Sequence, residues 1–397
     1  MVPGSFQLMK KINTGLILDT IRLYSPISRA EIAKMLNLTP ATVTNITAEL
    51  LRRNIIIESD LGQSTGGRKP VMLKINDKSY YLIAVHIGST RVRVAIMDME
   101  SEILDSKTEK LYENIDFKIA KDILFRLINE MIINNKLEKS KILGIGVSAH
   151  GIVNFEKGKI VFAPNFGWKN IPLREILEKE FDVPAFVDRD VRSMALAESW
   201  YGEGREVESF ICIKVGYGIG AALINNKQQI RGVSDGLGEF GHIKIDINGR
   251  KCICGNNGCL EAYASERSVI RYAKENGYLE DLNLDKLNEE TEKGNKIVIE
   301  AIHKAGHYLG IGISNLINIF NPSLIVIGGD LIDVNDVFFQ EMLLSAEKYA
   351  LSELFEHVKI KRTKTGKDAI IKGAGLLVLD NLFDSIQREV VVWKSMW

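Results

Sequence analysis

The sequence of 397 residues is poor in cysteine, carries no net charge and lacks any long hydrophobic run. A membrane-spanning helix needs about 18 or more consecutive apolar residues, so none is expected here. The N-terminal segment MVPGSFQLMKK lacks the apolar core of a secretory signal. Three of the four cysteines lie within eight residues, which favours a metal site in a reducing compartment over a disulfide framework. These absences predict a cytoplasmic protein.

The rest of the composition is that of an ordinary globular protein, with 46% apolar and 26% charged residues. A chain of this length is expected to form two or three domains. Its charge is uneven: the segment up to Lys74 holds ten basic and five acidic side chains, so it carries +5 and the remainder −5. A basic head on an acidic body is typical of a nucleic-acid-binding module joined to a second function.

The head has the pattern of short amphipathic helices. GLILDTIRLY has apolar residues at helical spacing, and SRAEIAKMLNL follows with Ser28 as N-cap and Glu31 completing a capping box. TPATVTNITAELLRRN begins with Thr39 as N-cap and Pro40 at the first helical position. The pattern predicts a helix-turn-helix whose last helix enters the major groove of double-stranded DNA. The residues predicted to contact DNA from these helices are Ser28, Thr39, Pro40, Ala41, Thr42, Thr44 and Asn45.

Two short strand segments, IIIE and VMLKI, enclose the glycine-rich loop DLGQSTGGRK. We expect this hairpin to be the wing of a winged helix, with Arg68 and Lys69 at its tip. An arginine there is expected to enter a narrow A·T-rich minor groove. The alternative is a small helical bundle with a glycine hairpin. The capped last helix, the wing and the basic charge favour a winged helix-turn-helix DNA-binding domain over residues 1–76.

After Asn76 the pattern changes to apolar strand segments separated by helical segments such as KIAKDILFRLINEMI. This alternation predicts an α/β architecture. Glycine-containing turns follow several of the strands, at the sheet edge where ligands bind in open α/β folds. The expected strands are YYLIAVHIG, RVRVAIMD, ILGIGVSA, PAFVD, SFICIKVG and SLIVIGGD.

One motif in the body has the spacing of a metal site, H-x9-C-x-C-x4-C. Three thiolates and one imidazole suit tetrahedral Zn²⁺ with no open position, so a structural zinc is expected. Free buried cysteines are the alternative, although Gly255 and Gly258 supply the tight loop that such ligands need. The predicted zinc ligands are His242, Cys252, Cys254 and Cys259.

Head and body together resemble the ROK family (repressors, open reading frames and sugar kinases), in particular its winged-helix repressor branch. The resemblance extends over nearly the whole chain. It implies an actin-like, two-lobed sugar kinase fold behind the winged helix-turn-helix. The segments that carry it are PISRAEIAK, TPATVTNIT, GGRKPVML, APNFGW, VDRDVRSMALAE, GYGIGAALI, GEFGHIKID, CICGNNGCLEAYAS and NPSLIVIGGD.

The same resemblance implies the division of the body. The first lobe is expected over residues 77–190. The second lobe is expected over residues 191–375, with the zinc loop and the dimerisation surface. A C-terminal helix of about residues 376–397 is expected to return to the first lobe.

The resemblance also implies a sugar site, and it makes the four residues of the metal motif the zinc ligands of the family. Carboxylate, amide and imidazole groups exchange hydrogen bonds with a polyol, and a site built around particular hydroxyls rejects analogues that lack them. Zinc would hold one ring nitrogen of His242 and leave the other free for the sugar or a neighbouring side chain. The implied sugar-binding residues are Asn165, Asp190, Glu239, His242 and Glu261.

The nucleotide-binding turns depart from the pattern of the ROK kinases. His86 stands where the kinases have an aspartate for Mg²⁺, and a neutral imidazole is a poor ligand for that hard cation. Tyr217 replaces a small hydroxyl residue in the second phosphate turn, and Asp330 adds a negative charge to the last turn. Phosphoryl transfer depends on positioning and on charge neutralisation by the metal. We therefore expect neither ATP binding nor enzymatic activity.

Asp190 matches the catalytic base of the kinases. Arg189 and Arg192 replace the asparagines on either side of it, and their guanidinium groups are expected to keep Asp190 ionised. Asp190 would then accept a hydrogen bond from a sugar hydroxyl rather than act as a base. The arginines also leave the sugar open, because they could narrow the pocket or favour an anionic ligand.

The resulting hypothesis is a sugar-responsive transcriptional repressor. A homodimer would bind a palindromic operator and would be released from it by the sugar. The resemblance makes xylose the leading inducer, with glucose, a β-glucoside or another plant-wall sugar still open. One alternative is an ATP-dependent hexose or N-acetylhexosamine kinase with a regulatory DNA-binding head. Another is a DNA-binding protein whose effector is a partner protein.

Overall fold

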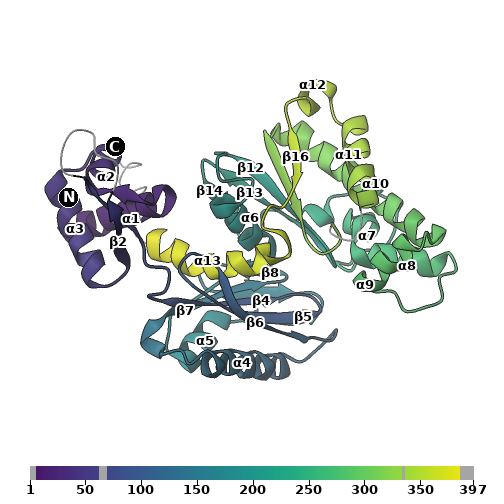
Figure 1. The fold of residues 1–397 in the computed structure, drawn as a ribbon. Coiled ribbons are helices and arrows are strands. Elements are labelled where there is room, and N and C mark those ends of the chain that lie inside the picture. The colour runs from purple at the N-terminus through teal and green to yellow at the C-terminus, as the bar shows by residue number, and fades with distance from the viewer. Residues whose placement is uncertain (1–5, 62–68, 333–335, 385–397) are drawn as a thin grey trace.

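The computed structural model describes residues 6–61, 69–332 and 336–384. They form a small head at one end of the molecule and a larger α/β body of two lobes (Figure 1). Each lobe is built around one five-stranded sheet, and helices α6 (Asp190–Tyr201) and α13 (Ala369–Asp384) lie between the two sheets. None of the described helices is both long enough and apolar enough to cross a membrane.

The head folds as three helices and a three-stranded antiparallel sheet in the order β1–β3–β2. The Ser28 hydroxyl accepts a hydrogen bond from the Glu31 backbone, and the Glu31 carboxylate accepts one from the Ser28 backbone, so the predicted capping box is present. Thr39 caps the third helix, whose first residue is Pro40. The expected wing tip at Arg68 lies outside the described residues. The elements are α1 (Phe6–Tyr24), β1 (Ile27–Ser28), α2 (Arg29–Leu36), α3 (Pro40–Arg52), β2 (Ile56–Leu61) and β3 (Val71–Ile75).

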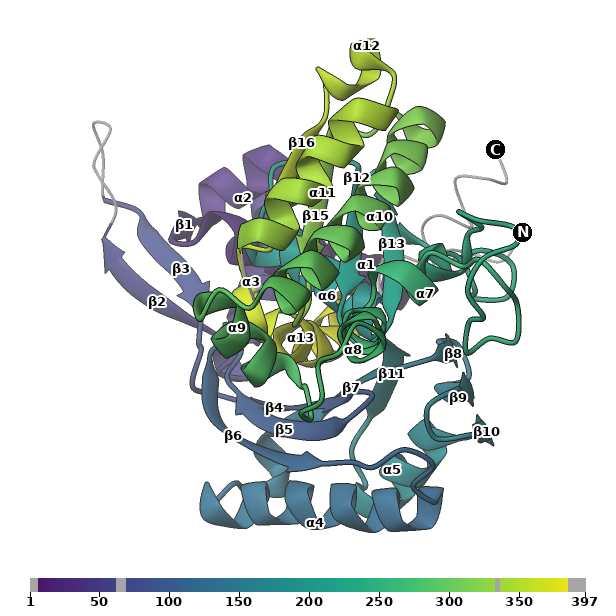
Figure 2. The same ribbon diagram turned by 90° about the vertical axis from the view of Figure 1, so that its right-hand side faces the viewer.

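Lobe 1 contains a mixed sheet in the order β11–β7–β4–β5–β6. Strand β4 pairs antiparallel with β5 and parallel with β7. Helices α4 and α5 pack on one face of this sheet, and Figure 2 shows α4 lying along it. Strands β8, β9 and β10 form a smaller antiparallel sheet beside β11. The elements are β4 (Tyr81–Ile87), β5 (Arg91–Met97), β6 (Ile103–Lys110), α4 (Phe117–Asn134), β7 (Ile142–Ala149), β8 (Ile152–Asn154), β9 (Lys159–Ala163), β10 (Trp168–Ile171), α5 (Leu173–Phe181) and β11 (Ala185–Arg189).

Lobe 2 repeats this strand pattern in the order β14–β13–β12–β15–β16. An antiparallel hairpin again precedes two parallel strands. Helix α6 packs on one face of the sheet, and α10, α8 and α11 form the core on the other. The elements are β12 (Phe210–Val215), β13 (Ile219–Asn225), β14 (Gln228–Ile230), α7 (Glu261–Ala264), α8 (Glu266–Glu275), α9 (Leu284–Glu292), α10 (Lys296–Phe320), β15 (Leu324–Gly328), α11 (Asp336–Tyr349), α12 (Ser352–Phe355) and β16 (Lys359–Arg362).

Helices α6 (Asp190–Tyr201) and α13 (Ala369–Asp384) cross each other between the sheets. Helix α13 leaves lobe 2 and packs against the lobe 1 sheet. It begins at Ala369, earlier than the start near residue 376 that the sequence suggested. Glycines within this segment disfavour an isolated helix. A Cβ at Gly373 would lie 1.8 Å from the Ser193 carbonyl oxygen of α6, so only glycine lets the two helices approach so closely. The packing that this approach allows outweighs the low helix propensity of the glycines.

The core of the head continues into lobe 1. Helix α1 packs on α13, and the buried apolar residues of the head and of lobe 1 belong to one cluster. The Arg22 guanidinium on α1 lies 3.8 Å from the centre of the Trp200 ring, near the end of α6. Arg205 donates a hydrogen bond of 3.4 Å to the Leu23 carbonyl. The head is therefore attached to the helix that begins at Asp190.

Candidate functional site

Asp190 lies at the junction of β11 and α6, buried between the lobes. Its Oδ2 accepts a hydrogen bond of 2.5 Å from the ammonium group of Lys214 on β12 of lobe 2. Burial is the largest single influence and would raise the pKa of Asp190, but the charge and hydrogen bond of Lys214, together with the neighbouring His150 and His86, outweigh it and hold that pKa well below its ordinary value. Asp190 is therefore an ionised hydrogen-bond acceptor, as expected from the sequence.

The cation that stabilises the ionised form of Asp190 is not the one predicted. We expected Arg189 and Arg192 to be its neighbours, but their ion pairs go elsewhere. Arg189 Nη2 lies 2.9 Å from Glu239 Oε1, and its Nη1 donates to a backbone carbonyl at 3.2 Å. The expectation was wrong because consecutive side chains at a strand-to-helix junction point in different directions. Lys214 was missed because it is a single polar residue within an apolar strand segment.

Arg192 belongs to a buried network that ties lobe 2 to lobe 1. Its guanidinium lies 3.1 Å from Asp188 and 3.3 Å from Asp235. Asp188 also pairs with Arg231 at 2.8 Å, and the Arg231 guanidinium lies 3.9 Å from the centre of the Phe155 ring in lobe 1. The segment between β14 and Glu239 is thereby held beside Asp190 at the junction of the two lobes, here termed the crevice.

Glu261 and His150 approach the same crevice from opposite lobes. Glu261 is the first residue of α7, and its Oε2 accepts a hydrogen bond of 2.9 Å from the Ile219 backbone. A Cβ on Gly218 would lie 2.9 Å from Glu261 Oε2 and 3.8 Å from His150 Cε1. His150 was not predicted, although it directly follows β7, at the carboxyl end of a parallel strand where ligands bind.

Six buried polar atoms at the carboxyl ends of lobe 1 strands β4, β7, β9 and β11, or in the turns after them, lack a hydrogen-bond partner among the described residues. A buried polar group without a partner costs about 1–3 kcal/mol, so each calls for a ligand or water. Asn165 lies in the turn after β9, and no hydrogen bond within the described part of the chain joins it to the other predicted sugar-site residues. The unpartnered atoms are His86 Nε2, Ser89 Oγ, Ser148 Oγ, His150 Nε2, Asn165 Nδ2 and Arg189 Nε.

The four predicted metal ligands lie together. Their ligand atoms all fall within 4.8 Å of one another, so His242, Cys252, Cys254 and Cys259 form a cluster that could hold a metal ion. His242 Nδ1 lies 3.7 Å from Cys252 Sγ, and Cys254 Sγ lies 3.7 Å from Cys259 Sγ. Lys244 donates to Cys259 Sγ at 3.0 Å and offsets part of the thiolate charge that a bound cation would leave.

The loop that carries these ligands needs glycine, and it also reaches the crevice. Gly258 has φ +70°, and a Cβ there would lie 1.5 Å from the Asp246 carbonyl oxygen. His242 turns Nδ1 toward the cysteines, while its Nε2 lies 3.8 Å from Glu239 Oε2. The metal cluster therefore positions an imidazole beside a predicted sugar-site carboxylate.

A cavity of about 740 Å³ includes His86 and Asp330 of the expected nucleotide-binding turns, together with Arg91, and this part of the body is termed the nucleotide side. Burial lowers the pKa of His86 to about 4, so its ring is neutral at pH 7. Arg91 Nη2 bonds to both carboxylate oxygens of Asp330, at 2.8 and 2.9 Å, and joins lobe 1 to lobe 2. The Tyr217 hydroxyl donates to Glu113 in a second bridge between the lobes.

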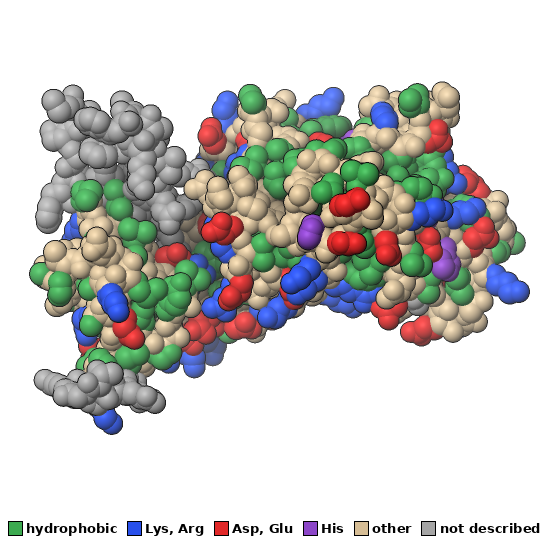
Figure 3. Space-filling view, turned by 90° about the horizontal axis from the view of Figure 1, so that it is seen from above, with side chains coloured by type: hydrophobic (Ala, Val, Ile, Leu, Met, Phe, Trp, Pro, Cys, Tyr) green, Lys and Arg blue, Asp and Glu red, His purple; other side chains and the backbone are tan. Residues whose placement is uncertain are grey.

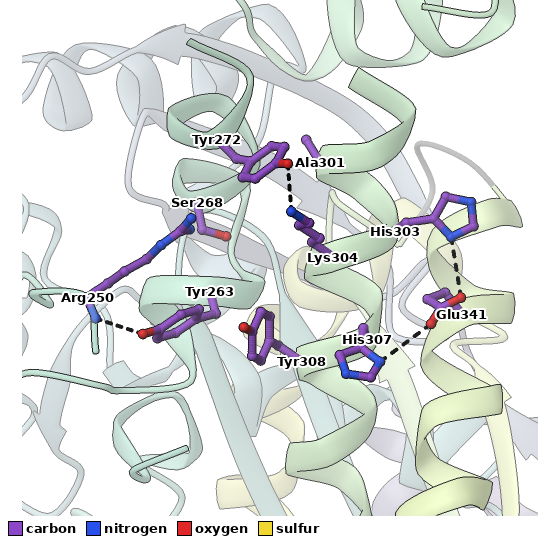
Figure 4. Close-up of a pocket in the computed structure, with 10 residues that line it drawn as sticks. All are labelled: Arg250, Tyr263, Ser268, Tyr272, Ala301, His303, Lys304, His307, Tyr308 and Glu341. Carbon is purple, nitrogen blue, oxygen red and sulfur yellow. Dashed lines mark hydrogen bonds and ion pairs between the residues drawn. The ribbon is translucent and has the colours of Figure 1, made fainter. Parts of the chain in front are cut away.

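Another cavity, of about 390 Å³, lies in lobe 2 beside α8, α10 and α11 (Figure 4). Its polar groups bond to one another: Lys304 Nζ donates to the Tyr272 hydroxyl at 2.7 Å, and Glu341 lies 3.3 Å from His303 and 3.6 Å from His307. Acidic and basic side chains are also interspersed over the face seen in Figure 3. This cavity therefore gives a weaker indication of a ligand than the crevice at Asp190.

The predicted DNA face of the head is largely accessible. Ser28 is the exception: it is 4% exposed and its hydroxyl bonds to Glu31, so its role is capping and the expected DNA contact is not supported. Thr42 is half-buried and Lys69 is exposed, whereas Arg68 lies outside the described residues. The exposed residues at the start of α3 are Thr39, Pro40, Ala41, Thr44 and Asn45.

A helix-turn-helix head on a two-lobed body with a crevice between the lobes defines a class of protein, the regulators built on a sugar kinase fold. The chain belongs to the ROK family, whose model matches residues 82–381. It is 32% identical to the xylose repressor of Bacillus subtilis over 95% of this chain and 97% of that one. It is 31% identical to the Escherichia coli dual regulator NagC over 96% of this chain and 98% of that one.

Solved structures agree with this assignment. A ROK family transcriptional regulator, described as a homologue of the E. coli MLC protein, superposes with a TM-score of 0.83 at 27% identity. The superposition covers 97% of this chain and 99% of that one, so it includes the head as well as both lobes. The predicted fold class is thereby confirmed.

Proposed function

We propose that the protein is a sugar-responsive transcriptional repressor whose effector binds in the crevice at Asp190. The observation that carries the proposal is the group of unpartnered buried polar atoms around an ionised carboxylate between two lobes. Hydroxyls of a sugar would satisfy these atoms. The relatives named above are repressors or regulators, which supports the same conclusion.

The proposed partner of the head is double-stranded operator DNA. The exposed start of α3 would enter the major groove, and Lys69 and Arg68 would contact DNA from the wing. A homodimer would present two such heads to a palindromic operator. Sugar binding between the lobes would move α6, and the contact of Trp200 with Arg22 would pass this movement to the head.

The Cys₃His cluster fits zinc, and we propose a structural Zn²⁺ held by His242, Cys252, Cys254 and Cys259. Four soft and borderline ligands within 4.8 Å suit a closed tetrahedral site. When bound, zinc would keep the cysteines deprotonated and hold the loop in place. His242 would then be fixed with Nε2 toward Glu239, at the edge of the sugar crevice.

We propose that the chain is not a kinase. His86 is neutral and is a poor ligand for Mg²⁺. The ion pair of Arg91 with Asp330 lies at the cavity beside the expected nucleotide-binding turns, and the bond between Tyr217 and Glu113 is a second link between the lobes. A coupled assay for ADP release tests this directly. Sustained, sugar-dependent turnover that Asp190→Asn abolishes would establish the kinase alternative.

The central experiment measures operator binding with and without sugar. Operator fragments are selected from random DNA by the purified full-length protein, and affinity is followed by gel shift. D-xylose or a related sugar should weaken binding by roughly 5- to 150-fold, the usual range of allosteric coupling. Asp190→Asn should bind DNA normally but lose this response, whereas Asp330→Asn, on the nucleotide side, should keep it. No response of the wild type to any sugar in a broad panel would contradict the proposal.

A further inference from the structure

We infer that a cavity beside the loop of the metal ligands binds a phosphate group. The cavity has a volume of about 250 Å³ and lies between that loop, α7 and the first two turns of α8. This inference goes beyond the proposed function, because it assigns a ligand of another chemical class to a site outside the crevice. The lining side chains that carry the argument are Lys251, Glu261, Arg267 and Arg271.

The lining of this cavity carries an excess of positive charge. Its three cationic side chains, one lysine and two arginines, outnumber its single carboxylate, that of Glu261. A Zn²⁺ ion held by three thiolates and a neutral imidazole would add one negative charge nearby, which still leaves the balance positive. Cations held close together repel one another, so an anion in the cavity would lower the free energy of the site.

Arg267 has no anionic partner in the part of the chain that the structure describes. Its side chain makes neither an ion pair nor a hydrogen bond there, and its guanidinium lies 4.9 Å from the centre of the Tyr217 ring. The side chain is half-buried, so water stabilises its charge only in part. Contact with the face of a ring leaves the N–H donors in the guanidinium plane free for a ligand.

Arg271 is also incompletely partnered. Its Nη2 donates a hydrogen bond of 2.6 Å to the Ala262 carbonyl, but its Nε is buried and has no hydrogen-bond partner among the described residues. Glu275 Oε1 lies 3.9 Å from that Nε, which is too far for a hydrogen bond. Burial lowers the pKa of Arg271, and the charge of Arg250 adds to this effect. These observations describe a guanidinium that an anion would stabilise.

The cavity adjoins the crevice at Asp190. Glu261 lines the cavity, and the Oε2 of the same side chain accepts the hydrogen bond from the Ile219 backbone at the crevice. Burial lowers the pKa of His150, and the charge of Arg267 is one of several that add to this effect, so Arg267 is near the crevice as well. A phosphate group in the cavity would therefore belong either to a phosphorylated sugar that extends from the crevice or to a free phosphate ion.

The number of cations favours phosphate over a carboxylate. A phosphate monoester carries about −1.5 to −2 charges at pH 7 and has three strong acceptor oxygens. A carboxylate carries one charge, and a single arginine satisfies it with two parallel hydrogen bonds. Two arginines and a lysine exceed what a carboxylate needs, whereas they match the charge and the oxygens of a phosphate.

Calorimetry on the full-length, zinc-loaded protein tests the inference with inorganic phosphate, D-glucose 1-phosphate, D-glucose 6-phosphate and D-glucose. At least one of the three phosphate compounds should bind with a Kd of about 1 mM or lower. Added sodium chloride should weaken this binding, because it depends on charge. An ester that binds more tightly than both inorganic phosphate and D-glucose would identify the phosphate as part of the effector. Inorganic phosphate that binds as tightly as the esters would identify a site for the free ion.

Variants then test the residues of the cavity. Arg267→Gln should weaken phosphate binding by about tenfold or more, and Arg267→Lys, which keeps the charge but not the fork, by less. Lys251→Gln provides a second test at an exposed position and should weaken binding by about threefold. Lys274→Gln is the matched control, because it removes a positive charge from α8 outside the lining and should bind phosphate like the wild type. Thermal unfolding confirms that each variant is folded.

The outcomes distinguish this inference from the proposed function. Failure of all three phosphate compounds to bind the wild type would overturn the inference. Phosphate binding that Arg267→Gln and Lys251→Gln leave unchanged would overturn it too. Either result would leave the sugar-responsive repressor standing, because the response of operator binding to neutral sugars tests that proposal. Phosphate binding that Arg267→Gln weakens, in a protein whose operator binding responds to no sugar, would support the inference and contradict the proposed function.

Discussion

The polar side chains of the body are partnered differently on its sugar side, at Asp190, and on its nucleotide side, at Arg91 and Asp330. On the sugar side, Asp190, Arg189 and His150 lie at the junction of the lobes. Arg189 Nε and His150 Nε2 are buried there without a hydrogen-bond partner among the described residues. On the nucleotide side, Arg91 and Asp330 meet across the cavity, with side chains 43% and 46% exposed. The unpartnered buried atoms of Arg189 and His150 are costly without a ligand, whereas the exposed ion pair of Arg91 with Asp330 is satisfied without one.

The difference between the two sides suits a protein that has a two-lobed kinase fold and that we propose responds to a sugar. The ion pair of Arg91 with Asp330 joins the two lobes at the nucleotide side without a ligand. Keeping unsatisfied groups in the sugar crevice retains the free energy that a sugar can release on binding. Under the proposed function, the protein would keep ligand-driven movement of the lobes without the chemistry of phosphoryl transfer.

The largest predicted effect concerns the metal cluster, which supports only the sugar side. Cys259→Ser should release the metal, destabilise the loop by several kcal/mol and abolish sugar-dependent thermal stabilisation, because His242 and Glu239 lose their support. Metal content and thermal unfolding measure this. Cys212→Ala is the control: Cys212 is buried in β12 outside the cluster, so that variant should keep its metal and its sugar response. Full metal content in Cys259→Ser would contradict the assignment of the ligands.

An intermediate effect is expected from pH. Burial lowers the pKa of both His150, on the sugar side, and His86, on the nucleotide side, to about 4. In the unfolded chain a histidine titrates near 6.5, so the unfolded state binds protons first as the pH falls. Stability is therefore full above about pH 6.5 and is lost between there and pH 4, by about 1 kcal/mol or more for each histidine.

Urea unfolding at pH 7, 6 and 5 measures this loss, and a single-histidine variant assigns it to one side. His150→Gln and His86→Gln should each reduce the change in the free energy of unfolding between pH 7 and pH 5. Sugar should oppose the loss in the wild type if His150 faces the ligand. A profile that neither substitution changes would show that the two rings are accessible to protons in the folded protein.

The smallest effect is expected on the nucleotide side. Asp330→Asn breaks the exposed ion pair with Arg91 and should cost at most about 1 kcal/mol, and less at high salt. Sugar affinity should stay within about twofold of the wild type. Unfolding in low and high salt, with calorimetry of sugar binding, provides the comparison. A large loss of sugar affinity would mean that the two sides are more tightly coupled than their separate contacts indicate.

Local sequence signals predicted the parts of this molecule that depend on neighbours in the chain. The capping box at Ser28, the Thr39 cap and the grouping of His242 with three cysteines are present as the spacing indicated. Lys214 and His150 escaped prediction, because their importance arises only when the two lobes meet. The partners of Arg189 and Arg192 were misassigned for the same reason, since proximity in sequence was taken for contact in space.

Helix α6 begins at Asp190 and ends at Tyr201, beside the Trp200 ring that holds Arg22 of the head. A helix of this length is a rigid rod of about 18 Å. Under the proposed function, its amino end would respond to a sugar at Asp190, and its carboxyl end would pass this response to the head through the contact of Trp200 with Arg22. Substitutions around Asp190 that fit another small molecule would then change the effector specificity of the protein, while helix α6 and the head stayed the same.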